Sequence, residues 1–423
     1  MKPVLERVPQ CSRPALFFES LYNLGAGSLI AVYWLSSVAL KTIPQLAGQD
    51  IHLAVLSSVF GGSSLLSPLV PWTARFTSMR NLVVMPNLLV AACLAATAFP
   101  FVTGWSPAGW WFTACVGIAF IARVFPRVAE MNMYRVLYPP TARGVAVGWL
   151  KAVAGVAGLS TVIGGYLWFE FFPHLYWGLY VGCAALLGFS AWAYHQIPLS
   201  RRARFGRPSE HSPFRALLAG IRTFCNDKRF LAFQTGFAIG GAANHMAMGY
   251  VSEIMKETLR ADDTVVRQVG ALLPAIFLTA CAPLAGRYLD RVNPMTGRAV
   301  FNFFQAASYG CYALGTWTRS VWPMVLGACL FGVANSGGVI TWLTGSLYFA
   351  RDDRIALYNA VHVALTGLRG MLAPLLGLYL YRAADDGGVL LLVVATLLSL
   401  AGSLWMAIQG RLDPGSRETD GAP

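Results

Sequence analysis

The chain alternates between long apolar stretches and short polar connections along nearly its whole length. Each stretch approaches the roughly 20 mostly apolar residues that an α-helix needs to cross the hydrocarbon core of a bilayer. This pattern predicts helices that have lipid, rather than water, as their solvent. Twelve membrane-spanning helices are expected, at about 15–40, 52–73, 81–101, 108–134, 144–169, 175–196, 230–255, 268–286, 299–315, 323–346, 357–380 and 389–410.

Composition supports an all-α polytopic membrane protein. Of the 423 residues, 56% are hydrophobic and only 12% are charged, whereas soluble domains carry about 25% charged residues. A soluble chain of this length would lack the charge to cover its surface. The net charge of +13 does not indicate nucleic-acid binding, because the basic residues lie in short connections between apolar stretches and not on one face of a soluble domain.

The distribution of Lys and Arg predicts an orientation. With both termini in the cytoplasm, 22 basic residues fall on the cytoplasmic side of the expected spans and 6 on the opposite side. Membrane proteins carry such an excess on their cytoplasmic side. We therefore expect an even number of spans in a multi-pass protein of the cell (inner or plasma) membrane, with both ends inside.

The longest polar stretch, near 197–229, divides the chain into two halves of similar length. Its arginines predict a cytoplasmic linker that partly lies on the anionic membrane surface. Connections in the two halves correspond at offsets of about 210–216 residues, and repeated halves with a site between them are common in secondary transporters. The expected organisation is a six-helix half at 1–197, a linker at 198–228, a six-helix half at 229–410 and a cytoplasmic tail at 411–423.

One connection in the second half reads Gly286-Arg287-Tyr288-Leu289-Asp290-Arg291 and continues to Gly297-Arg298. At that place among twelve expected spans, it is similar to the loop signature of the major facilitator superfamily, from which it departs by the inserted residues 293–296. The resemblance implies two pseudo-symmetric six-helix halves that expose a solute to each side of the membrane in turn. The first-half copy of the loop has Ala74 where the family usually has Asp, and the span at 144–169 lacks the proline associated with antiporters in the family.

Four residues of this loop, Gly286, Asp290, Arg291 and Arg298, are expected to form a conformational latch. Gly286 allows neighbouring helices to approach closely. Asp290 can pair with an arginine or lie at the N-terminus of a neighbouring helix, where its charge is favourable. Contacts of this kind hold in only one arrangement of the halves. An ordinary positively charged loop is the alternative.

The expected fourth span carries three ionisable residues on one face. Arg123, Arg127 and Glu130 follow an i, i+4, i+7 spacing, which is one side of an α-helix. Ionisable side chains deep in a membrane are costly and generally mark function, and Pro126 is expected to loosen the helix beside them. The family often has an arginine here that takes part in proton or substrate coupling, a role that the resemblance gives to Arg123. The alternative is an Arg127–Glu130 pair that only stabilises packing.

Other spans are expected to carry polar residues as well. Glu19 could pair with Arg127 or carry a proton, and Asn335 begins an Asn-Ser-Gly-Gly run that is expected to break its helix. Cations outnumber carboxylates among these groups, and arginine binds carboxylate or phosphate with paired donors, so an anionic or zwitterionic substrate is favoured. The residues predicted to bind substrate or to couple an ion are Glu19, Asn23, Arg123, Arg127, Glu130, Lys151, His245, Asn335 and Arg369.

The sequence contains no pattern for another energy source or for catalysis. No GxxxxGK[ST], HExxH, GxSxG or paired CxxC occurs, so no cofactor, metal or enzymatic activity is expected. Protons are the expected coupling ion, because Glu19, Glu130 and His245 can titrate; symport, antiport, sodium coupling and facilitated diffusion stay open. The sequence thus predicts a monomeric secondary active transporter for a small solute. The alternatives are a transporter-like scaffold or receptor without flux and, less favoured, an integral-membrane enzyme.

Overall fold

The computed structural model describes residues 4, 6–105, 107–198, 212–351, 354–384, 388–413 and 415, and within these ranges the chain forms helices joined by short connections, without a strand. Side chains and prolines fix several helix starts. Ser78, Asp227 and Asn293 each accept a hydrogen bond from a backbone N–H of the first turn that follows, as N-cap residues do. Pro140 and Pro294 begin their helices, where the missing N–H costs no hydrogen bond.

The first half of the chain forms one six-helix bundle, in which several spans consist of two helical segments. Its elements are η1 (Gln10–Ser12), α2 (Arg13–Thr42), η2 (Pro44–Leu46), α3 (Asp50–Gly62), η3 (Ser63–Leu66), α4 (Leu69–Thr73), α5 (Met79–Ala96), α6 (Phe99–Thr103), α7 (Ala108–Ala122), α8 (Val124–Leu137), α9 (Pro140–Phe171), η4 (Pro173–Leu175) and α10 (Tyr176–His195).

The second half repeats this plan after α11 (Pro213–Asn226), a helix of the expected linker. Its elements are α12 (Lys228–Ala247), η5 (Met248–Tyr250), α13 (Val251–Glu257), α14 (Asp263–Arg267), the π-helical η6 (Gln268–Leu272), α15 (Leu273–Leu289), α16 (Pro294–Thr318), α17 (Val321–Phe349), α18 (Ile355–Ala383) and α19 (Val389–Leu412).

The helices match the twelve expected spans. Nine helical stretches of the described chain are long and apolar enough to cross a membrane. Of the others, α3 is short, and α12 and α16 bury polar side chains such as Gln234, Asn302 and Gln305. Those side chains lower the hydropathy of the two helices without preventing them from spanning, because they face neighbouring helices and not lipid. The all-α polytopic fold in two six-helix halves is confirmed, while the residue boundaries given for the halves stay a prediction.

Large apolar side chains cover the outside of the bundles. Trp322 is 80% exposed, Trp317 75% and Tyr379 69%, and leucines such as Leu375 and Leu404 are exposed to a similar degree. A soluble monomer rarely exposes so much contiguous apolar surface. The exposed side chains therefore agree with a multi-pass membrane protein whose helices face lipid.

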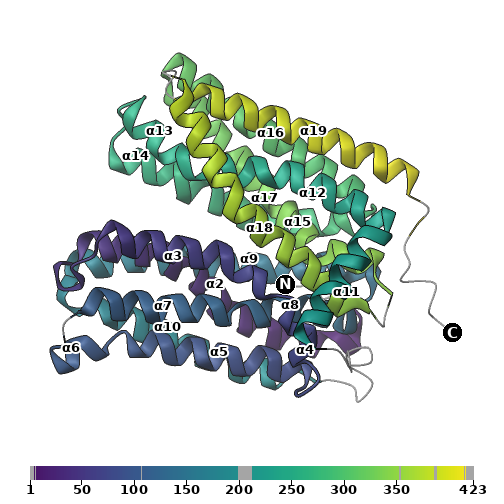
Figure 1. The fold of residues 1–423 in the computed structure, drawn as a ribbon, viewed down its shortest axis with the longest axis horizontal. Coiled ribbons are helices and arrows are strands. Elements are labelled where there is room, and N and C mark those ends of the chain that lie inside the picture. The colour runs from purple at the N-terminus through teal and green to yellow at the C-terminus, as the bar shows by residue number, and fades with distance from the viewer. Residues whose placement is uncertain are drawn as a thin grey trace.

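Figure 1 shows the two halves as separate bundles, purple to blue for the first and green to yellow for the second. They meet where α4, α8 and α11 lie and diverge towards α6 and α13, although on one side Arg267, at the end of α14, still lies 5.9 Å from the ring centre of Tyr166 on α9. We refer to the end with α4, α8 and α11 as the closed end, and to the other as the far end. Hydrogen bonds between the halves gather at the closed end, where Ser67 donates to the Ala360 carbonyl and Asn359 donates to Asn132.

Helices α9 and α15 pack against each other across the boundary between the halves. A Cβ atom at Gly144 would lie 2.5 Å from the Gly286 carbonyl oxygen, and one at Gly148 would lie 2.5 Å from the Ala282 carbonyl oxygen. Such a distance is too short for any side chain, so these positions require glycine for as long as the helices stay in contact. The expectation that Gly286 lies at a close helix approach is met by this geometry.

The expected break of the helix at residues 335–338 is wrong, because α17 runs without interruption from Val321 to Phe349. Gly337 and Gly338 instead leave space for side chains of α16. A Cβ atom at Gly338 would lie 2.7 Å from Nη1 of Arg298, and one at Gly337 would collide with the ring of Phe301. The two glycines therefore serve packing within the second half.

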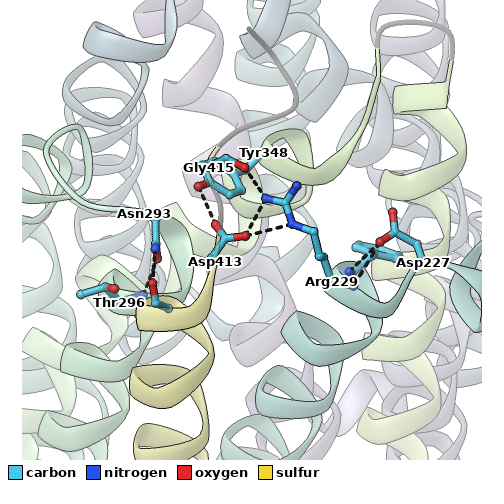
Figure 2. Close-up of polar contacts among 9 residues, drawn as sticks. Asp227, Arg229, Asn293, Thr296, Tyr348, Asp413 and Gly415 are labelled. Carbon is cyan, nitrogen blue, oxygen red and sulfur yellow. Dashed lines mark hydrogen bonds and ion pairs between the residues drawn. The ribbon is translucent and has the colours of Figure 1, made fainter. Parts of the chain in front are cut away.

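The closed end of the second half is fastened by a polar cluster, shown in Figure 2. Nε of Arg229, at the start of α12, lies 2.9 Å from Oδ1 of Asp413, and the Tyr348 hydroxyl donates to Oδ2 of Asp413 over 2.6 Å. Nearby, Asn293 donates to the Gly410 carbonyl over 2.8 Å. These contacts tie α12, α17, α19 and the start of α16 together, so this end of the half is held as one unit.

Candidate substrate and coupling site

A buried ion pair occupies the interior of the first half. Nη1 of Arg123 lies 2.8 Å from Oε1 of Glu130 and donates to the Tyr22 hydroxyl over 2.6 Å. Tyr22 in turn donates to Glu130, and Asn87 donates to Tyr22 over 3.2 Å. Only 3% of Glu130 is exposed. The carboxylate therefore has a cation and a hydroxyl as partners, which a buried charge requires.

The backbone around Pro126 positions this pair. Proline lacks an N–H and its ring clashes with the carbonyl four residues earlier, and the span accordingly divides at Arg123, where α7 ends and α8 begins. Glu130, seven residues after Arg123, then lies on the same side of the span. The ion pair thus joins Arg123 to Glu130, and the alternative pairing of Arg127 with Glu130 is not formed.

Glu19, on α2, has a different environment from Glu130. Only 1% of it is exposed, and its one hydrogen-bond donor among the described residues is the Tyr138 hydroxyl, 2.5 Å from Oε2. The structure gives Glu19 no ion pair with Arg127. Lys151 lies close enough to act on its charge, but the Lys151 ammonium is 3.4 Å from Oδ1 of Asn23 instead. Glu19, Asn23 and Lys151 are therefore brought together beside the Arg123–Glu130 pair.

The second half contains a cluster of cations that the sequence pattern did not group. The guanidinium of Arg298 lies 4.4 Å from the ring centre of Phe237, and Nη1 of Arg369 donates to the Phe237 carbonyl over 2.5 Å. Arg369 is near enough to act electrostatically on Arg298 and on His362. Within the described chain neither arginine has a carboxylate partner. Arg298, predicted to belong to the latch, thus lies with Arg369.

Aromatic rings surround His362 in this cluster. The His362 ring centre lies 5.0 Å from that of Phe237 and 5.6 Å from that of Trp342. The Gln234 amide lies 2.9 Å from Nδ1 of His362, while the Trp342 indole donates to the Thr366 hydroxyl over 3.0 Å. Three nitrogens of the cluster are buried without a hydrogen-bond partner in the described structure, namely Nε of Arg298, Nε of Arg369 and Nε2 of His362.

Arg127 reaches from the first half to this cluster. Its guanidinium lies 5.7 Å from the ring centre of Trp342 and 3.4 Å from the Ser64 hydroxyl. A cation over the face of an indole is attracted by the ring. Arg127 therefore contacts the second half through Trp342, although sequence spacing placed it only with Arg123 and Glu130.

The predicted latch residue Asp290 makes a contact between the halves at the closed end. Its two carboxylate oxygens accept hydrogen bonds from the backbone N–H groups of Gly144, at 2.5 Å, and Val145, at 2.8 Å, in α9. Burial raises the pKa of Asp290, while these two N–H groups and the charge of Arg143 oppose that effect. The carboxylate thus contacts the fifth and sixth residues of α9, which begins at Pro140, rather than its first turn. Arg291 is exposed in the following turn.

Further polar contacts join the halves at the closed end, between α8 and the helices α17 and α18. Asn359 donates to Oδ1 of Asn132 over 2.6 Å, and Arg135 donates to the carbonyls of Leu347 and Ala350 over 3.1 and 2.8 Å. The sequence pattern did not distinguish these residues from other polar positions. Asn132 could have been predicted to contact another helix, because it is a polar residue two positions after Glu130 in an apolar span. In the structure it is 1% exposed.

Two predicted site residues lie apart from these contacts. His245, on α12, is half-buried near Gly370, and Arg369 acts on it electrostatically. Asn335, on α17, is half-buried and has no hydrogen bond to either cluster among the described residues. The structure therefore groups Arg298, Arg369 and His362, with Arg127 over the neighbouring Trp342, His245 at the edge and Asn335 outside.

Comparison with known proteins decides the family. Residues 22–374 match the sequence profile of the Major Facilitator Superfamily. The chain belongs to this superfamily. A search of curated protein sequences found no match.

Solved structures of the superfamily have the same fold. A proton:xylose symporter, XylE, bound to 6-bromo-6-deoxy-D-glucose is similar with a TM-score of 0.72 at 14% identity, over 94% of this chain and 95% of that one. The human organic anion transporter MFSD10 has a TM-score of 0.71 at 16% identity, over 94% and 100%. A bacterial homologue of the iron transporter ferroportin, in an outward-facing state, has a TM-score of 0.71 at 13% identity, over 95% and 99%.

Proposed function

We propose that this superfamily member is a secondary active transporter that moves a small anionic or zwitterionic solute by alternating access, with protons as the coupling ion. The observation that carries the proposal is that hydrogen bonds between the halves gather at the closed end, whereas the bundles diverge towards the far end (Figure 1). Two halves that meet at one end around a polar interior are the arrangement expected for one of two alternating states.

The proposed orientation places the closed end in the cytoplasm. Basic residues flank this end on several helices, among them Arg80, Arg135, Arg143, Arg287 and Arg411, and basic flanks favour the cytoplasmic side. The described state is then outward-facing, as in the similar ferroportin homologue. A solute would enter between the halves from the far end.

The charge balance supports an anionic or zwitterionic solute. In the first half Glu130 neutralises Arg123, so this pair leaves little net charge for a ligand. In the second half Arg298 and Arg369 have no carboxylate partner within the described chain, and Arg127 of the first half lies over Trp342, a neighbour of His362. Unpaired guanidinium groups in a membrane interior favour an anion.

Glu19 is the proposed proton carrier. An ionised carboxylate that is removed from water without a cation partner is costly, and a single hydroxyl from Tyr138 compensates for little of that cost. Glu130, by contrast, is held as a carboxylate by Arg123 and Tyr22. Proton exchange at Glu19 therefore requires the least rearrangement of existing ion pairs.

Reconstitution in vesicles tests the proposal. Purified protein with an imposed pH gradient is screened against pooled carboxylates, phosphate esters and amino acids; saturable, gradient-dependent uptake is expected. Glu19→Gln should abolish accumulation against a gradient while exchange persists, and Glu170→Gln, at an exposed position of α9, is the matched control. Uptake that ignores the pH gradient refutes proton coupling. Tight binding of a solute without transport would favour a receptor or scaffold. This alternative stays open because Ala74 stands where the family usually has an aspartate in the first-half loop.

A further inference from the structure

We propose that Arg298 and Arg369, with His362 beside them, form the subsite that binds the oxyanion group of the solute, a carboxylate or a phosphate. This inference rests on the proposed transport function and deepens it. In this proposal the anion binds to the second half of the protein, and Arg298, which was predicted to be a latch residue, is a residue that binds the solute.

The charges of this cluster are incomplete without a ligand. Arg298 is 7% exposed and His362 is 1% exposed, Arg369 is half-buried, and no described carboxylate lies in contact with either arginine. A buried cation without an anionic partner is strongly unfavourable. The ring of Phe237 and its carbonyl compensate only in part, because neither carries a full negative charge. In the first half, by contrast, the buried Arg123 has the carboxylate of Glu130 as its partner.

Three side-chain nitrogens of the cluster are available to donate hydrogen bonds to an anion. Nε of Arg298, Nε of Arg369 and Nε2 of His362 are all buried and lack a partner in the described structure. Buried polar groups nearly always have hydrogen-bond partners, and no described protein atom accepts from these three nitrogens, so they are free to donate to the oxygens of a ligand. Guanidinium groups match the paired oxygens of carboxylate and phosphate. Nδ1 of His362 already contacts Gln234, which leaves Nε2 for the ligand.

Glycines in the surrounding helices make room for the two arginines. A Cβ atom at Gly241 would collide with the guanidinium of Arg369, and one at Gly338 would lie 2.7 Å from Nη1 of Arg298. Both guanidinium groups are therefore fitted closely against backbone, and their positions are fixed before a ligand arrives. Preorganised donors bind a ligand at a lower entropic cost.

The rest of the solute would lie against aromatic side chains. Phe237 and Trp342 flank His362, and Arg127 of the first half lies over Trp342. Phe237 is 2% exposed and carries Arg298 on its ring face, whereas Trp342 is half-buried, so an organic anion with a flat or apolar body would stack on Trp342. A solute in contact with Trp342 would also contact the half that carries Arg127, which would make its binding sensitive to the arrangement of the halves.

Ligand-induced thermal stabilisation of the purified full-length protein tests the assignment. Benzoate and phenyl phosphate serve as probes, and benzamide and benzyl alcohol serve as neutral analogues. At least one anion should raise the melting temperature, whereas the neutral analogues should not. Arg298→Gln and Arg369→Gln should each weaken anion binding by about 10- to 100-fold, which corresponds to the loss of hydrogen bonds to a charged group. Arg222→Gln, at an exposed position of α11, should leave binding unchanged.

The ligand-free variants separate a binding role from a structural one. Removal of an unpaired buried charge should leave the melting temperature of the empty protein unchanged or raise it, whereas loss of a structural arginine would lower it. Anion binding that survives both substitutions overturns the subsite but leaves anion transport standing. A wild-type protein that binds neither probe overturns the subsite as proposed, and the uptake screen then decides separately whether any anion is carried.

Discussion

Replacement of Asp290 by alanine removes the acceptor that joins α15 to the start of α9. In the closed-end arrangement the carboxylate accepts two backbone hydrogen bonds, from Gly144 and Val145. Hydrogen bonds to a charged group contribute about 1.5–3 kcal/mol each, and burial of the carboxylate opposes part of this gain. A net loss of about 2 kcal/mol is therefore expected for the state closed at this end, which shifts its equilibrium by about 30-fold.

Distances between spin labels report this shift. Labels at Phe76→Cys, which is 72% exposed in the first half, and at Arg411→Cys, which is exposed in the second, lie at the ends of their bundles. The exposed thiols Cys11 and Cys225 are replaced by serine beforehand. Asp290→Ala should increase the population with a long distance between the labels.

A substitution that breaks an ion pair within one half is the control. Arg229→Gln removes the contact to Asp413, which lies wholly in the second half (Figure 2). It should lower the melting temperature and leave the distance distribution unchanged. If Asp290→Ala leaves that distribution as it is in the wild type, Asp290 is not a latch and the loop is an ordinary connection.

Two further predictions concern packing and charge. Gly148→Val should destabilise the closed-end arrangement by about 1–3 kcal/mol, because its Cβ would lie 2.5 Å from the Ala282 carbonyl oxygen. The distance between the spin labels at positions 76 and 411 should then increase. Gly164→Val, with open space around its Cβ, should leave that distance unchanged. Glu130→Gln leaves Arg123 buried without its anion and should cost about 3–5 kcal/mol, read as a lower melting temperature that Arg123→Met in the same chain largely restores. A stable single variant would contradict the role given to this pair.

The sequence was sufficient for the fold because each span is a local feature. Twelve apolar stretches with basic flanks on alternating sides require only the length and hydropathy of each stretch. The spacing of Arg123 and Glu130 likewise predicted a shared helix face, and the ion pair lies there. Asp290 was singled out through its motif, and it accepts hydrogen bonds from two backbone N–H groups in the first half of the chain; its role as a latch stays a prediction.

Hydropathy and residue spacing did not predict the contacts between helices. The position of Arg298 within the loop signature suggested a latch residue, but its side chain packs on the ring of Phe237. The spacing of residues in the sequence shows which side chains share a helix face, but it does not show which neighbouring helix that face contacts. Asn132 and Asn359, in hydrogen-bond contact, are 227 residues apart in sequence. The glycines of α17 were wrongly predicted to break their helix. Their actual role is to leave space for Phe301 and Arg298, which lie on another helix and are therefore not evident from the local sequence.

Alternating access itself is tested most directly by a reversible lock on the closed end. Asn132 and Asn359 lie 2.6 Å apart between Oδ1 and Nδ2, so cysteines at both positions, in a chain without its native cysteines, should be joined by a short thiol cross-linker that a reductant cleaves. Cross-linked protein in vesicles should bind solute from the far end but carry none across, and cleavage should restore uptake. Uptake at the full rate by the fully cross-linked protein would show that the halves do not need to separate at this end.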